Sequence, residues 1–141
     1  DTNTARSDSG LTALMAASHG GNEVCLRLLL ENGADANANA AMSDDGWTSL
    51  MLASMGGYED CLRLLLEHGA DANAVTSDNG TTALMLASKG GHKCCVGLLL
   101  ENGADANVVK SDDGWTALMH ASEGGHDDCV SLLLEHGRVQ M

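Results

Sequence analysis

The chain has 141 residues, the length of one domain, and a formal net charge of −13 from 20 acidic and 7 basic side chains. This charge argues against nucleic acid and anionic membrane surfaces as partners, because both attract clusters of Lys and Arg. It favours a basic protein partner, or it serves solubility alone.

Regularly spaced glycines divide the chain into copies of one unit. After a polar lead-in over residues 1–7, they stand at Gly10, Gly46, Gly80 and Gly114, with spacings of 36, 34 and 34 residues. A period of this size is typical of a repeat array. The sequence therefore predicts one domain over residues 1–141, with repeats at about 8–43, 44–77, 78–111 and 112–141.

The third copy illustrates the helix signals of all four. Thr82 precedes an apolar run, as an N-cap residue should, and predicts a helix over residues 83–88 that ends at a Gly-Gly pair. A second helix, with a broad apolar stripe, is expected over residues 92–101. Gly103 is predicted to end this second helix as a C-cap residue in the left-handed conformation, and Gly137 has the same place in copy four. Because such short helices are unstable alone in water, the copies must stack.

The repeated pattern G-x-T-A-L-M-x-A-S…G-G…L-L-L-E-x-G-A-D-A-N resembles the ankyrin repeat over nearly the whole chain. The resemblance implies an all-α solenoid of stacked helix-turn-helix units with extended, β-hairpin-like fingers between them. Two features depart from the family pattern. The chain has no Pro, and Met replaces the His that helps to cross-link neighbouring repeats, so that network is in question here. The methionines are Met15, Met51, Met85 and Met119.

The loops before the recurring glycines are longer than the family's usual period would give. The first of them, over residues 38–45, is the longest. In ankyrin repeats these loops form the fingers, and they vary most from copy to copy here.

Four of the five cysteines occupy one repeat position, namely Cys25, Cys61, Cys95 and Cys129. We expect them to be buried as small hydrophobic side chains. Stacked helices lie about 8–10 Å apart, whereas a disulfide needs Cα atoms within about 7 Å, so no bridge is predicted. Free thiols, and the lack of a signal peptide or membrane-spanning run, predict an intracellular site, cytoplasmic or nuclear. Cys94, one residue earlier, is expected to be exposed and the most reactive.

The two ends of the array differ in sequence. Copy four is expected to be partly capped by Asp127, Asp128 and Ser131, since array ends carry polar residues. Copy one has Val24 where copies two and four have Asp, which suggests either that the array continues before it or that the lead-in covers Val24.

Catalytic and metal sites find little support. His92 with Cys95 and His126 with Cys129 recur at i, i+3, but a zinc site needs four ligands and the cysteines are expected to point inward. A buried thiol is also a poor nucleophile. The Asp-Asp-Gly tips of the fingers are typical of turns and lack the spacing of a calcium loop. The sequence predicts no enzyme, no cofactor and no metal.

The residues expected to bind a partner are those that line the concave face of an ankyrin stack and vary between copies. Exposed Trp residues rimmed by carboxylates resemble the arrangement of a binding hot spot. Packing of each Trp on its neighbouring finger is the alternative. The set consists of Asp44, Asp45, Trp47, Met55, Asp78, Asn79, Thr81, Lys89, Asp112, Asp113, Trp115 and Glu123.

The sequence therefore predicts a monomeric protein-protein interaction module that binds another protein, one with a basic patch, through the groove and fingers. Two alternatives stay open. The near-identity of the copies suits an engineered or consensus-like scaffold without a natural ligand. The second alternative is a regulatory or inhibitory subunit of an enzyme, which is a special case of a protein-protein interaction module.

Overall fold

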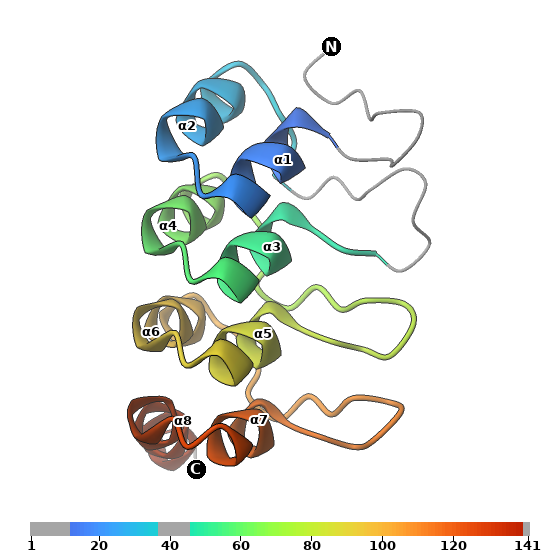
Figure 1. Cartoon of the computed structure of the whole chain (residues 1–141), viewed down its shortest axis with the longest axis vertical. Helices are drawn as coiled ribbons and strands as arrows, with labels where there is room; N and C mark the ends of the chain where they lie inside the picture. The colour runs from blue at the N-terminus through green and yellow to red at the C-terminus, as the bar shows by residue number, and fades with distance from the viewer. Residues whose placement is uncertain (1–11, 37–45, 140–141) are drawn as a thin grey trace.

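The computed structural model describes residues 12–36 and 46–139. Within these residues the chain forms eight helices in four antiparallel pairs (Figure 1). The first helices stack in one column, the second helices in another, and the loops extend from the column of first helices. The pairs are α1 (Ala13–Gly20) and α2 (Glu23–Glu31), α3 (Ser49–Gly56) and α4 (Glu59–Glu67), α5 (Ala83–Gly90) and α6 (Lys93–Glu101), and α7 (Ala117–Glu123) and α8 (Asp127–Val139). The predicted all-helical solenoid is confirmed.

Threonine begins every first helix. The Thr82 hydroxyl accepts a hydrogen bond of 3.2 Å from the Met85 N–H, and the other three copies repeat this contact through Thr12, Thr48 and Thr116. The bond pairs one of the N–H groups that a helix N-terminus leaves without a partner. At the other end of α5, Gly91 adopts a left-handed conformation with φ of 74° and closes the helix. The predicted caps are confirmed.

The second helix of copies one to three ends at a left-handed glycine. At Gly103 φ is 89°, and the next N–H, that of Ala104, donates to the Leu99 carbonyl at 2.9 Å. Copy four was expected to do the same at Gly137, and this prediction is wrong, because α8 continues to Val139. The alanine that follows the glycine in the other copies, buried in copies one and three, is replaced by Arg138.

The core lies between successive copies. Leu14, Leu50 and Leu84 fill it from the first helices, and Leu65 and Leu99 from the second. Each is at most 1% exposed. The broad stripe expected on α6 is narrower than predicted, because Leu98 is only half-buried. In α4 the equivalent Leu64 is 8% exposed.

The repeated cysteines show which neighbour each second helix faces. Burial raises the pKa of the Cys61 thiol, and the Glu23 carboxylate on α2 raises it further, so Cys61 faces the preceding copy. Cys95 and Cys129 are buried in the same way. Cys25 was also expected to be buried, and this is wrong: it is exposed. It has the same helix position, but no earlier copy lies against it among the residues that the structure describes. Cys94 is exposed, as predicted.

Histidine rings at the start of the second helices form hydrogen bonds to the preceding copy. His126 Nε2 lies 3.0 Å from the Lys89 carbonyl oxygen, and His92 Nε2 lies 3.1 Å from the Met55 carbonyl oxygen. A carbonyl can only accept, so these ring nitrogens carry the proton. Each ring packs against a glycine of the preceding copy, and a Cβ at Gly91 would lie 2.6 Å from His126 Nδ1. Although Met replaces the His that cross-links repeats in the family pattern, neighbouring copies are still joined by hydrogen bonds, here from the histidines at the start of the second helices.

The fingers in copies three and four are tight turns on short extended arms. In the first of these, the Thr76 N–H donates to the Thr81 carbonyl at 3.0 Å, and Gly80 turns the chain with φ of 73°. An isolated antiparallel bridge pairs Val75 with Thr82, at the base of this finger, and gives it limited hairpin character. The longest expected finger, 38–45, lies wholly outside the described residues.

Candidate interaction surface

The finger over residues 108–115 fixes the position of Trp115. The Trp115 N–H donates to Asp113 Oδ1 at 3.0 Å, and the Trp115 carbonyl accepts from the Lys110 N–H at 2.9 Å. The indole is half-buried, and its ring centroid lies 5.1 Å from that of His120 on α7, at an interplanar angle of 53°. Trp115 is thus held by its finger on one side and by a helix on the other.

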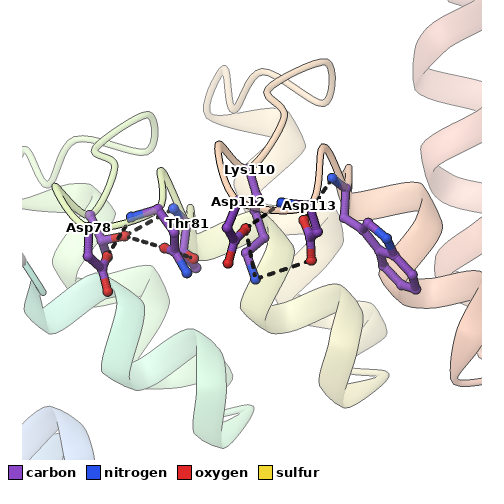
Figure 2. A network of polar contacts seen from close by, with 8 residues as sticks. Asp78, Thr81, Lys110, Asp112 and Asp113 are labelled. Atoms are coloured by element: carbon purple, nitrogen blue, oxygen red, sulfur yellow. Dashed lines mark hydrogen bonds and ion pairs between the residues drawn. The ribbon is translucent and has the colours of Figure 1, made fainter.

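Lys110 lies among the carboxylates of the same finger. Its Nζ is 3.8 Å from Asp113 Oδ2 and 4.0 Å from Asp112 Oδ1, and Figure 2 shows the ammonium pointing toward both. Both carboxylates are exposed, so these ion pairs are weak and screened by salt. The finger therefore presents carboxylates whose charge is only partly offset by Lys110.

The preceding finger has a different internal network. Asn79 Oδ1 accepts hydrogen bonds from the Thr76 hydroxyl at 2.9 Å and from the Thr81 hydroxyl at 2.7 Å. The Thr76 hydroxyl can instead donate to the Asp78 carboxylate, and this is the main cause that lowers the pKa of Asp78 below its ordinary value; Lys110 adds to it. The Ser111 N–H donates to the Asn79 carbonyl at 2.8 Å and joins the two fingers.

The predicted binding residues differ in how far they are exposed in the structure. Thr81 is only 9% exposed and its hydroxyl is engaged, so it supports the finger and offers little surface. Trp47 is half-buried against the core. Met55, Lys89 and Glu123 are exposed at the ends of α3, α5 and α7. Asp44 and Asp45 lie outside the described residues.

His120 is a surface residue that the sequence reasoning missed. Burial is the main cause that lowers its pKa below the ordinary value, and the positive charges of Lys110 and Lys89 lower it further. Its equivalents in the preceding copies are Leu86 and Leu52, both half-buried. The signal was present in the sequence, because this is the most variable position of the T-[A/S]-L-M-x-A motif that all four copies share.

The histidine and cysteine pairs considered as zinc ligands serve the stack instead. The rings of His92 and His126 bond to carbonyls, and burial raises the pKa of Cys95 to about 11, which disfavours the thiolate that a metal needs. In the part of the chain that the structure describes, no three His, Cys, Asp or Glu side chains are grouped as metal ligands would be. Nor does any helix of that part have the length and hydrophobicity needed to cross a membrane.

These features define a helical repeat protein of stacked helix pairs, with fingers that present Trp115 and exposed carboxylates. A family model for ankyrin repeats (3 copies) matches residues 1–76 and again residues 71–141. The chain belongs to the ankyrin repeat family. A search of curated proteins finds no match. Ankyrin repeats generally act as protein-protein interaction modules and are typically not enzymes.

Proposed function

We propose that the chain binds a partner protein through one surface, here called the finger surface, and has no catalytic role. The finger surface consists of Trp47, Met55, Lys89, Asp112, Asp113, Trp115, His120 and Glu123. The observation that carries the proposal is the fixed, half-buried Trp115, whose ring lies tilted against that of His120. An aromatic side chain that is already ordered loses little entropy when a partner covers it. Trp is also among the residues most enriched in binding hot spots.

The charges of the finger surface favour a partner with basic residues around an apolar anchor. Asp112 and Asp113 are exposed beside Trp115, and the chain as a whole carries −13. Rim charges of this kind mainly set the association rate and its salt dependence, whereas desolvated apolar anchors set the dissociation rate. The positive charge of Lys110 sits inside the cluster, so we expect the basic groups of the partner to reach the outer carboxylates.

We infer that the protein works in a reducing, intracellular compartment. The five described cysteines are free thiols. Three of them are buried in the stack, and disulfides are rare in proteins of reducing compartments.

A peptide display selection against the immobilised chain tests this function. Selected binders should carry basic residues next to an aromatic or aliphatic anchor. Trp115→Ala should speed their dissociation at least about tenfold, equivalent to about 1.4 kcal/mol, and Trp47→Ala should act in the same direction. Asp112→Asn should slow association and flatten its salt dependence. It is preferred to a change at Asp113, which bonds the Trp115 backbone.

Val24→Ala is the matched control, because Val24 is an exposed apolar residue on α2, a helix of the other column. It should leave binding unchanged. Binders whose dissociation is indifferent to both Trp changes would place the interaction elsewhere, on the second-helix side or on the finger over residues 38–45.

A further inference from the structure

His120 on α7 differs in chemical type from the residues at the same position of the two preceding copies. Those residues are Leu86 on α5 and Leu52 on α3, and all three side chains are half-buried. Because Leu86 and Leu52 belong to interior copies, the partial exposure of His120 is a property of its position on the first helix and not of the end of the stack. Copy four thus presents an imidazole where copies two and three present apolar side chains.

The ring of His120 also differs from the two histidine rings that join the copies. The rings of His92 and His126 bond to carbonyls of the preceding copy. Among the residues that the structure describes, no hydrogen bond engages the ring nitrogens of His120, and its ring lies against Trp115, with 5.1 Å between the centroids. A neutral imidazole has one nitrogen that donates and one that accepts. Both can therefore bond to a molecule that covers the indole.

Charged groups of the finger, of α5 and of α7 act on His120. They are Lys110 and Asp113 on the finger, Lys89 on α5 and Glu123 on α7. Burial is the largest cause that lowers the pKa of His120 below its ordinary value of 6.5, and the two lysines lower it further, whereas the two carboxylates raise it. The imidazole is therefore mostly neutral at pH 7.

We propose that His120 determines specificity at the finger surface, in that its unprotonated ring nitrogen accepts a hydrogen bond from a lysine or arginine of the partner beside Trp115. This inference rests on the proposed binding function and specifies the contact. Lysine and arginine side chains only donate, so a neutral imidazole is a suitable acceptor for them. A leucine, as in copies two and three, could pack on the partner but could not accept this bond.

Acidification should release such a partner. An imidazolium has no acceptor nitrogen and carries a positive charge, so it repels the cation that the neutral ring binds. Protonation of His120 therefore competes with binding, and the affinity should fall as the pH drops below the ordinary histidine value of 6.5.

The test measures how tightly the whole chain binds a selected peptide that contains no histidine and has one lysine or arginine next to its anchor. The wild type should bind it at least about threefold more weakly at pH 5 than at pH 7. His120→Gln keeps a neutral acceptor that does not titrate, so it should bind within about twofold of the wild type at pH 7 and equally well at pH 5. His120→Leu should bind about fivefold more weakly at pH 7, without pH dependence.

His68→Gln is the matched control, because His68 is an exposed histidine at the end of α4, in the column of second helices. It should keep the pH profile of the wild type. A peptide whose lysine or arginine is replaced by methionine should lose the pH dependence and should no longer distinguish the wild type from His120→Leu.

Fluorescence tests the protonation step without a partner. The chain has two tryptophans, so in Trp47→Phe the emission comes from Trp115 alone. A protonated imidazole in contact with an indole quenches it, and the emission should fall as the pH drops below 6.5. The fall should be absent in Trp47→Phe/His120→Gln, and circular dichroism should show native helix content in both. If adding His120→Gln leaves the titration unchanged, the inference is wrong, whether or not a peptide has been found.

The binding results separate this inference from the proposed function. Peptides that depend on Trp115 but show the same pH profile with the wild type and with His120→Gln would overturn the role of His120 and leave the finger surface as the binding site. Peptides that are indifferent to Trp115→Ala would overturn the proposed function, and the role of His120 with it.

Discussion

An interior copy and a terminal copy of this protein contain the same residues in different surroundings. Leu64 on α4 is packed on the preceding copy, whereas Leu28 on α2 is mostly in solvent. Met85 and Met119 differ in the same way at the other end. Helix propensity and caps are alike in the two cases, since Thr12 and Thr48 cap their helices by the same contact. The comparison teaches that in a solenoid a residue gains its stabilising effect from the neighbouring copy and not from its own helix.

The largest expected effect is the difference between two identical leucine truncations. Leu64→Ala should cost about 2–5 kcal/mol of unfolding free energy, because it leaves a cavity between copies one and two. Leu28→Ala should cost less than about 1 kcal/mol, since the side chain is exposed. Denaturant titration of the two variants and the wild type measures both costs. Equal costs would contradict the interior-terminal distinction.

A smaller effect is expected from two glycines with the same backbone conformation. Gly91 and Gly125 have φ of 74° and 70°. An alanine at either position must adopt the left-handed backbone conformation, which lowers the free energy of unfolding by about 1–2 kcal/mol. Only Gly91→Ala also displaces the ring of His126 and its bond to the Lys89 carbonyl, which adds about 1 kcal/mol. Thermal melts of the two variants should therefore separate, with Gly91→Ala the less stable.

The smallest effect is a pH dependence that arises from the interior thiols. The pKa of Cys95 is about 11 in the folded chain against an ordinary value of 9.0, so the folded state holds its proton more tightly. Its contribution to stability is complete below pH 9 and is lost as the pH rises toward 11. Cys95→Ala should reduce the loss of stability between about pH 8 and pH 10 by about 1 kcal/mol.

Cys25→Ala is the matched comparison at the terminal copy. Cys25 is exposed, so this variant should lose stability over the same pH range as the wild type does. All other side chains are common to the compared proteins, and the difference between variants removes their effect. A slope unchanged by Cys95→Ala would mean that its thiol is not shielded by stacking.

The sequence by itself determined everything that depends on neighbours along the chain. The glycine period set the number of helix pairs, and Thr82 before an apolar run located the start of α5. Gly91 and Gly103, which can adopt positive φ without strain, located the helix ends. The family followed from the same motifs. Trp115 was selected as a contact residue because it varies between otherwise similar copies.

Only the tertiary structure decided the burial and the hydrogen bonds that depend on a neighbouring copy. Cys25 and Cys61 stand in similar local sequence, and their burial differs because, within the described residues, only Cys61 of these two has a preceding copy against it. His126 was considered in the sequence only as a zinc ligand beside Cys129, yet its partner is a carbonyl of another copy. A local pattern determines a residue's place on its helix, but burial and hydrogen bonding require the position of a second helix, which comes only from the packing of the stack.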